Sequence, residues 1–172
     1  MPASIFVGVS LDGFLARCDG GLDWLLEDSS EPHGFGAFLE TVDVLVMGRN
    51  TFDIVAAFDA WPYGSKPVVV LSGRPVDLSA VPVPAEQMTG APTEIVARLA
   101  ARGMGRLYVD GGITIQEFLR AGLVDRLIVT RVPVLIGEGI PLFGPLPQDV
   151  RLDHIGTRSF PDGLVQSEYR VR

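Results

Sequence analysis

The stretch Val46-Met47-Gly48-Arg49-Asn50-Thr51-Phe52 joins an apolar, strand-like run to the start of a helix-like segment through one glycine. Glycine permits a close approach to the backbone, arginine presents a planar fork of donors that suits phosphate oxygens, and a helix start supplies unpaired amides. A strand that ends in this way predicts an anion-binding turn at the carboxyl edge of an α/β sheet. The alternative is an ordinary turn with a helix cap, in which Gly48, Arg49 and Thr51 bind nothing.

Three other segments repeat the order of apolar run and small or polar turn residues. They are Ser10-Leu11-Asp12-Gly13-Phe14-Leu15-Ala16, Leu71-Ser72-Gly73-Arg74 and Val109-Asp110-Gly111-Gly112-Ile113-Thr114. Arg49 and Arg74 at adjacent strand ends favour a phosphate ester and therefore NADPH over NADH, while Gly111 and Gly112 permit close contact with a pyrophosphate. Each turn alone is weak evidence, and neither G-x-G-x-x-G nor G-x-x-x-x-G-K-[ST] occurs. The common order of the four segments is the more specific signal.

Apolar runs with strand character alternate with segments of helical periodicity along the whole chain. We predict strands at 5–10, 42–47, 67–71, 106–109 and 125–134, an edge strand within 76–92, and a hairpin of 150–160 and 164–171. We predict helices at 35–40, 51–58, 93–102 (capped by Thr93) and 113–121. Strands separated by helices require crossovers, which favours one α/β domain over residues 1–172 with a mostly parallel sheet and an antiparallel C-terminal hairpin.

Composition restricts the classes of partner. The chain has 172 residues, of which 47% are hydrophobic, and a formal net charge of −7. That charge argues against binding to nucleic-acid backbones, and no apolar run reaches the roughly 20 residues of a membrane span. Cys18 is the sole cysteine, so an internal disulfide or a cysteine-cluster metal site is excluded. We expect a cytoplasmic protein without a bound metal that acts on a small molecule.

From Ile5 to Tyr169 the order of motifs resembles the dihydrofolate reductase superfamily, and above all the reductase domain of the bacterial bifunctional riboflavin-biosynthesis deaminase-reductase. The motifs that carry the resemblance are Ser10 to Ala16, Met47 to Phe52, Val69 to Ser72, Asp110 to Gly112 and Val132 to Phe143. The run Gly137-Glu138-Gly139-Ile140-Pro141-Leu142-Phe143 is the most specific to that branch. The resemblance implies a three-layer α/β sandwich with about eight strands, NADPH as cofactor, a pteridine- or pyrimidine-like substrate, and a homodimer in which the tail strands supply a shared edge.

The resemblance also assigns site residues one by one. The cofactor-phosphate motif is matched by Gly48, Arg49 and Thr51, and the adenosine side of the site is matched by Leu71, Ser72 and Arg74. The pyrophosphate turn is matched by Gly111, Gly112, Ile113 and Thr114. The loop beside the nicotinamide is matched by Leu15 and Ala16. Thr130 matches a strand threonine beneath the substrate.

Several positions depart from the folate reductase pattern. Gly34 stands where those enzymes carry the carboxylate that holds the pterin, although Glu31 and His33 are near it in sequence. Asp12 is predicted at the mouth of the site, where it orients the substrate or relays a proton; its alternative role is to stabilise a turn. Asp110 occupies the place of a further glycine.

Three hypotheses follow. The first is an NADPH-dependent reductase of the riboflavin-reductase-like branch, and the second is a true dihydrofolate reductase, which needs a carboxylate from Glu31 or Asp12 in the pocket. The third is a non-catalytic nucleotide-binding protein on the same scaffold, because a fold does not guarantee a reaction. The sequence contains no deaminase half with its zinc-binding residues, so we do not expect a complete bifunctional riboflavin enzyme.

Overall fold

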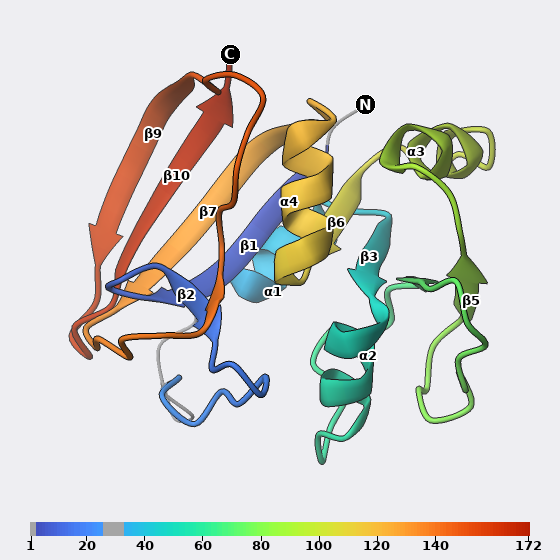
Figure 1. Ribbon diagram of the computed structural model, residues 1–172, viewed down its shortest axis with the longest axis horizontal. Helices are drawn as coiled ribbons and strands as arrows, with labels where there is room; N and C mark the ends of the chain where they lie inside the picture. The colour runs from blue at the N-terminus through green and yellow to red at the C-terminus, as the bar shows by residue number, and fades with distance from the viewer. Residues whose placement is uncertain (1–2, 26–32) are drawn as a thin grey trace.

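A twisted sheet organises the computed structural model, which describes residues 3–25 and 33–172 (Figure 1). Within these residues eight strands pair in the order β5-β4-β3-β6-β1-β7-β10-β9. Their bounds are Ala3–Ser10 (β1), Val44–Gly48 (β3), Val68–Leu71 (β4), Ala85–Met88 (β5), Leu107–Asp110 (β6), Val124–Val132 (β7), Leu152–Ser159 (β9) and Val165–Val171 (β10). All pairings from β5 to β7 are parallel, and β10 is antiparallel to β7 and to β9. The predicted mostly parallel sheet with a C-terminal hairpin is confirmed.

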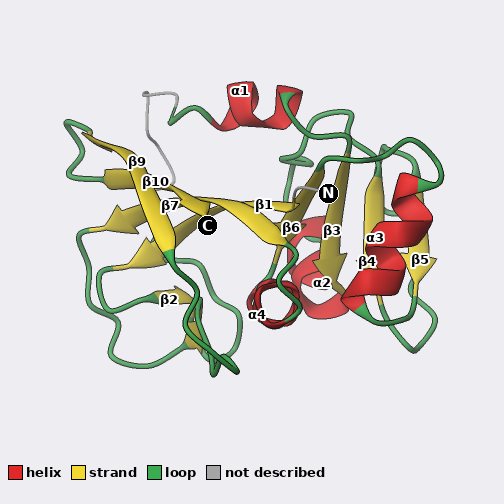
Figure 2. Ribbon diagram, turned by 90° about the horizontal axis from the view of Figure 1, so that it is seen from above, coloured by secondary structure: helices red, strands yellow, loops and turns green. Residues whose placement is uncertain are grey.

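Strand side chains alternate between two hydrophobic clusters, one on each face of the sheet. Val44 and Val46 of β3 join the cluster that contains buried side chains of α3 (Pro92–Ala100) and α4 (Gly112–Arg120). Leu45 and Met47 join the cluster that contains buried side chains of α1 (Phe35–Glu40) and α2 (Arg49–Ala56). The period of two in a strand therefore builds a three-layer arrangement. Figure 2 shows α1 and α4 on opposite sides of the sheet.

Two local predictions need correction. Thr93 does not cap α3: Ala91 is the N-cap, Pro92 takes the first helical position with its preset φ, and the Glu94 carboxylate accepts a hydrogen bond from the Ala91 amide at 3.0 Å. The short strands β2 (Phe14–Ala16) and β8 (Ile140–Pro141), expected as loop and turn, form a separate antiparallel pair. Neither segment has an alternating pattern long enough to predict a strand.

Some predictions are not decided by the fold. Glu31, considered above as a carboxylate for the pocket, lies outside the described residues. β9 lies at the free edge of the sheet, and the homodimer through the tail strands stays a prediction. Among the described residues, the helices are too short and too polar for any of them to cross a bilayer.

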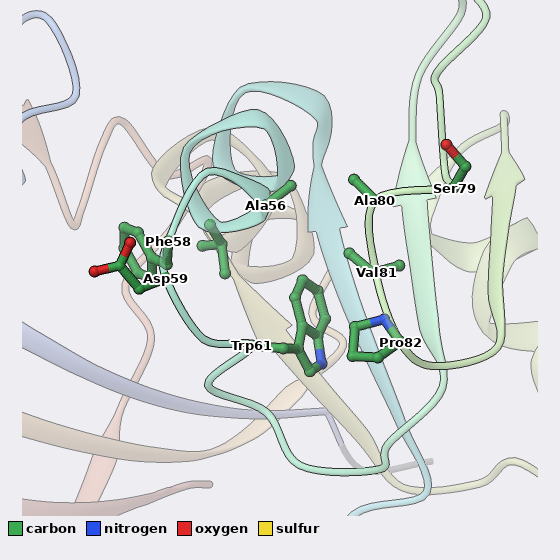
Figure 3. A pocket seen from close by; sticks show the side chains of 9 residues that line it. Ala56, Phe58, Asp59, Trp61, Ser79, Ala80, Val81 and Pro82 are labelled. Carbon is green, nitrogen blue, oxygen red and sulfur yellow. The ribbon is translucent and has the colours of Figure 1, made fainter.

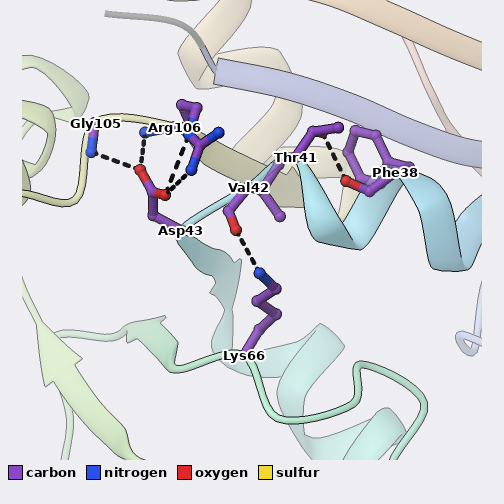
Figure 4. A network of polar contacts seen from close by, with 7 residues as sticks. All are labelled: Phe38, Thr41, Val42, Asp43, Lys66, Gly105 and Arg106. Atoms are coloured by element: carbon purple, nitrogen blue, oxygen red, sulfur yellow. Dashed lines mark hydrogen bonds and ion pairs between the residues drawn. The ribbon is translucent and has the colours of Figure 1, made fainter.

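At the amino ends of β3 and β6, one carboxylate joins two strands that are far apart in sequence (Figure 4). The amides of Gly105 and Arg106 donate to Oδ2 of Asp43 at 3.0 and 2.8 Å, and Arg106 Nη2 donates to Oδ1 at 2.6 Å. The Arg106 guanidinium and these amides hold the pKa of Asp43 below its usual value. This contact fixes the strand starts, and hence the register that positions the opposite edge.

We expect Asp43→Ala to lower the free energy of unfolding at pH 7 by about 2 kcal/mol, because two amides and a guanidinium lose a charged acceptor. Since the folded-state pKa is lowered, this contribution is present above the unfolded pKa of about 4 and is lost as the pH falls through the folded value. Urea unfolding at pH 7 and pH 3 measures both effects. Asp149→Ala, at an exposed aspartate, is the control. An equal deficit of Asp43→Ala at both pH values would contradict the electrostatic explanation.

Candidate functional site

Three strand ends lie next to one another at the carboxyl edge of the parallel sheet. In the register of the ladder Gly48 of β3 pairs with Leu71 of β4, and Met47 pairs with Asp110 of β6. Helices α2 and α4 begin immediately after β3 and β6. The three turns predicted after these strands therefore meet at one edge of the sheet. Open α/β sheets bind ligands at this edge.

Glycines let the two helix starts touch. A Cβ atom on Gly48 would lie 3.0 Å from Oγ1 of Thr114, and one on Gly111 would overlap the side chain of Thr51. Gly111 also has φ +92°, a backbone conformation that other residues rarely adopt. The N-caps Gly48 and Gly111 make no side-chain hydrogen bond to the first turn of their helices. The amides of the first turns of α2 and α4 thus lack a capping side chain and can meet an anionic ligand, whereas the Gly111 amide donates to Asp110.

The β2–β8 pair closes the site from the other side. A Cβ atom on Gly112 would lie 2.9 Å from Cγ2 of Ile140 and 3.4 Å from Cδ1 of Leu15. The loop after β2 then turns back to the sheet, where Leu25 reaches within 3.0 Å of the Cβ position of Gly8 in β1. Segments that are distant in sequence therefore wall the same space.

A cavity of about 320 Å³ lies between these segments. Five of the predicted cofactor residues line it, namely Leu15, Ala16, Thr51, Gly111 and Gly112. The other predicted cofactor residues, which are Gly48, Arg49, Leu71, Ser72, Arg74, Ile113 and Thr114, are not among its lining residues. They belong to the same three turns at this edge of the sheet.

The turn after β4 is held by its own backbone contacts. Ser72 Oγ accepts a hydrogen bond from the Arg74 amide at 3.1 Å and donates to the Arg74 carbonyl at 2.7 Å. The amide group of Gln87 donates to the carbonyls of Ser72 and Arg74 at 2.7 and 2.9 Å. These contacts fix the turn and leave Arg74 exposed beside the end of β4.

Five aromatic side chains, among them Phe58, line the cavity. Phe6 comes from β1, Phe35 from α1, Tyr108 from β6 and Tyr63 from the segment after α2. The ring of Phe35 lies 5.2 Å from that of Phe6 and 6.2 Å from that of Tyr63, measured between centroids. The lining of the cavity thus combines bare glycine backbone with aromatic rings.

Asp110 lines this cavity and was not predicted as a site residue. Tyr63 Oη donates a hydrogen bond of 2.6 Å to its Oδ2, and the Gly111 amide donates one of 2.8 Å to its Oδ1. Burial raises the pKa of Asp110 above its usual value, although both hydrogen bonds act in the opposite direction. Burial, with the nearby charge of Asp110, also raises the pKa of Tyr63, which keeps the phenol protonated as a donor. A buried carboxyl group with a raised pKa, beside a cavity, is a candidate acid.

Residues 4–166 match the model of the RibD C-terminal domain family. The match begins in β1 and ends in β10, and so includes every strand end and helix start that forms the cavity. The chain belongs to the RibD C-terminal domain family.

Solved structures that share the fold of this RibD C-terminal domain include three with informative names. A Shewanella sp. PV-4 protein assigned to riboflavin biosynthesis is 41% identical, with a TM-score of 0.91 over 100% of this chain and 99% of that chain. The Thermotoga maritima diaminohydroxyphosphoribosylaminopyrimidine deaminase/5-amino-6-(5-phosphoribosylamino)uracil reductase is 15% identical, with a TM-score of 0.76 over 99% of this chain and 56% of that chain. Dihydrofolate reductase from Enterococcus faecalis, solved with NADP(H), is 23% identical, with a TM-score of 0.68 over 100% and 96%. The predicted dihydrofolate reductase-like fold is confirmed.

Asp12 makes structural contacts in this RibD C-terminal domain. Its carboxylate accepts hydrogen bonds from Ser10 Oγ at 2.6 Å, from the Gly137 amide at 2.8 Å and from the Ile136 amide at 3.3 Å. The Ser10 hydroxyl, followed by these amides, holds the pKa of Asp12 below its usual value. Asp12 is not among the lining residues of the cavity. These contacts favour the turn-stabilising alternative, because they join the loop after β1 to the loop after β7.

Thr130 is buried in β7 and accepts a hydrogen bond of 3.0 Å from Nε2 of Gln166. Gln166 also donates to the His33 carbonyl at 3.0 Å, so this pair connects the sheet to the segment before α1. Gly34, with φ +83°, is the N-cap of α1 and offers no carboxylate at the position expected from folate reductases. Thr130 is not among the residues that line the cavity, and its predicted role beneath the substrate stays a prediction.

A second cavity, of about 380 Å³, lies between the end of α2 and residues 79–82 (Figure 3). Trp61 stands between these two segments, and its enclosed indole N–H has no hydrogen-bond partner among the described residues. None of the predicted site residues lines this cavity. Within the described part of the chain, no three His, Cys, Asp or Glu side chains group as a metal site would require.

Proposed function

We propose that this RibD C-terminal domain is an NADPH-dependent reductase that transfers a hydride to a small heterocycle held in the cavity lined by Asp110. The observation that carries the proposal is the contact of the α2 and α4 starts at Gly48, Thr51, Gly111 and Thr114, directly beside an aromatic cavity. Backbone that close, with free helix-start amides, suits a dinucleotide, and the adjacent aromatic walls suit a flat ring.

The residues around Gly111 and Gly112 fit the cofactor. A side chain at Gly111 or Gly112 would collide with Thr51 or Ile140, so bare backbone lines the cavity where the pyrophosphate would lie. Leu15 and Ala16 would hold the nicotinamide, and Arg49 with Arg74 would hold the 2′-phosphate. NADPH bound at this site supplies the hydride.

The protein's own residues supply orientation, exclusion of water and a proton. Phe6, Phe35 and Tyr108 provide apolar surface against which a ring can lie, and they keep water from the reacting atoms. Asp110, whose raised pKa favours its protonated form, donates the proton that must accompany the hydride, and Tyr63 orients its Oδ2. The carboxylate left behind is stabilised by Tyr63 Oη and the Gly111 amide.

A ligand titration followed by thermal denaturation tests the proposal. NADPH should raise the melting temperature more than NADH, FMN or a folate analogue does, because binding to the folded state alone stabilises it. NADPH consumption with pterin and pyrimidine acceptors then tests turnover. Binding of NADPH without consumption across this panel would favour the non-catalytic alternative, and low-concentration inhibition by methotrexate would favour a dihydrofolate reductase.

Arg49→Ala should weaken NADPH binding by about 2 kcal/mol and leave NADH binding nearly unchanged, because a charge-assisted contact to the 2′-phosphate is lost. Arg49 begins α2, and its Nε lies 3.5 Å from Oδ2 of Asp53, a loose contact that a phosphate can replace. Calorimetric titration of both cofactors measures the difference.

Asp53→Asn is the matched control for Arg49→Ala. It removes the helical partner of Arg49 without removing the guanidinium, so NADPH should bind as well as before or better. Equal losses of NADPH and NADH in Arg49→Ala would place Arg49 on another part of the cofactor.

A further inference from the structure

We propose that the reductase site of this chain takes a flat heteroaromatic ring that carries no phosphate group. The inference rests on the proposed function, because it names the substrate class of the same cavity. The Thermotoga maritima relative has a phosphoribosylamino side chain in the name of its uracil substrate. The chemistry of the cavity described here differs from what such a side chain requires.

The size of the cavity is the first reason. Its volume of about 320 Å³ is at the lower end of the range for ligand sites, which is about 300 to 1,000 Å³. This one space has to receive both the nicotinamide and the substrate ring. A sugar phosphate on the ring would therefore have to extend out of this space.

The aromatic walls determine the shape of the substrate. Tyr63 and Tyr108 have ring centroids 6.0 Å apart, and Phe35 lies 6.1 Å from Tyr108. Rings in this arrangement present apolar faces and edges, which stack well on a planar heterocycle and poorly on a hydrated phosphate. A flat ring is therefore the ligand that these walls fit.

The charge of the lining residues is a further reason. Among the described lining residues Asp110 is the one carboxylate, and none is lysine, arginine or histidine. A phosphate dianion that loses water needs cations or several amides as partners, and the described lining residues offer no cation.

The arginines that are close in sequence to lining residues of the cavity have other partners, observed or proposed. Arg17, directly after Ala16, donates to both carboxylate oxygens of Asp23 at 2.6 and 2.9 Å and lies at the surface. Arg49 belongs to the turn proposed for the cofactor phosphate. The helix-start amides are likewise those proposed for NADPH, so a substrate phosphate would compete with the cofactor for its partners.

The polar groups of the cavity indicate which hydrogen-bonding groups the substrate ring carries. Tyr108 donates its hydroxyl to the Phe6 carbonyl at 2.8 Å, so beside these aromatic rings Asp110 presents a polar group that can meet the ring of the substrate. A ring nitrogen or an amino group satisfies a carboxyl group directly. Unphosphorylated aminopyrimidines and pterins combine this edge with two apolar faces.

The test compares one pair of compounds that differ by a phosphate. Full-length protein saturated with NADPH is titrated with 5-amino-6-(5-phosphoribosylamino)uracil and with the same compound lacking its phosphate, and both binding and NADPH oxidation are measured. We expect the unphosphorylated compound, or an unphosphorylated aminopyrimidine or pterin, to bind at least about tenfold more tightly. Tighter binding of the phosphorylated compound, or no binding of any unphosphorylated ring, would overturn the inference.

A gain-of-function variant supplies an independent check. Asn50 lies in the first turn of α2, is exposed and lines the cavity. Asn50→Arg should shift preference toward the phosphorylated compound by about tenfold, whereas Asn50→Gln should not. An unshifted preference in Asn50→Arg would count against the inference, because the missing cation would then not set the selectivity.

The two proposals fail in different ways. If NADPH does not bind to the protein alone, the reductase function fails. If NADPH binds and is oxidised but the phosphorylated compound is preferred, the reductase function stands and only the substrate class is wrong.

Discussion

Asp110→Asn should lower kcat by about 100- to 1,000-fold while the protein remains folded, because asparagine keeps the shape of the side chain and removes the acidic proton. The Asn oxygen can still accept the 2.6 Å hydrogen bond from Tyr63, whereas the Gly111 amide then faces the Asn NH2 group and loses its acceptor. Burial raises the pKa of Asp110 in the folded state. Its stabilising contribution is therefore fully present below the unfolded pKa and is lost as the pH rises through the folded pKa. At pH 8 the variant should melt at the same temperature as the parent or higher.

The pH profile separates a catalytic acid from a structural carboxyl group. Turnover needs protonated Asp110, so kcat/KM of the parent should fall as the pH rises above the raised pKa, and Asp110→Asn should lack this limb. Steady-state kinetics between pH 5 and 9 measures it. Retention of kcat within about threefold, or a loss explained by a lower melting temperature, would remove Asp110 from the mechanism.

Tyr63→Phe is the informative companion variant. The Tyr63 hydroxyl donates to Asp110 and so favours its charged form. Without that donor the pKa of Asp110 should rise, and the alkaline limb of kcat/KM should move to higher pH. If Tyr63 served only to pack its ring, Tyr63→Phe would leave the alkaline fall of kcat/KM at the same pH as in the parent.

Gly111→Ala is expected to abolish measurable NADPH binding and to destabilise the fold by about 3 kcal/mol. Two causes add: the backbone of Gly111 has φ +92°, and a Cβ atom there would overlap Thr51. Relief of the overlap would separate the starts of α2 and α4, which together form the proposed pyrophosphate site. Urea unfolding and NADPH titration measure the two effects.

Gly103→Ala separates backbone strain from the loss of the site. Gly103 has φ +79°, and a Cβ atom there would meet no atom within 4 Å. This control should lose about 1 kcal/mol of stability and bind NADPH normally. NADPH binding by Gly111→Ala as strong as that of the control would show that the glycine turn does not hold the cofactor.

Much of the fold follows from short-range patterns that the sequence contains. The apolar runs of β3, β4 and β6 end at glycine or at a polar turn, and the helical period follows β3 and β6 at once. Those patterns predict parallel pairing because a crossover is required, and they locate the turns at Gly48, Ser72 and Gly111. The helix boundaries were less predictable: Pro92, and not Thr93, sets the start of α3.

The chemistry of the site was less predictable than its position. Tyr63 comes from an irregular segment, and nothing in its surroundings in sequence indicates that it meets Asp110, 47 residues away. Asp110 stood out only as an exception to the folate reductase pattern. Asp12 looked equally suited to catalysis and to a turn, and its contacts with Ser10 and Gly137 favour the turn.

By itself the sequence determined the order of strands and helices, the family, and the glycine turns that let backbone approach backbone, because each depends on neighbours along the chain. Only the tertiary structure decided that Tyr63, Phe35 and Asp110 share one cavity, and that burial gives Asp110 a raised pKa. The reason is physical: desolvation and side-chain contact depend on what surrounds a group in space, and the packing of distant segments creates those surroundings.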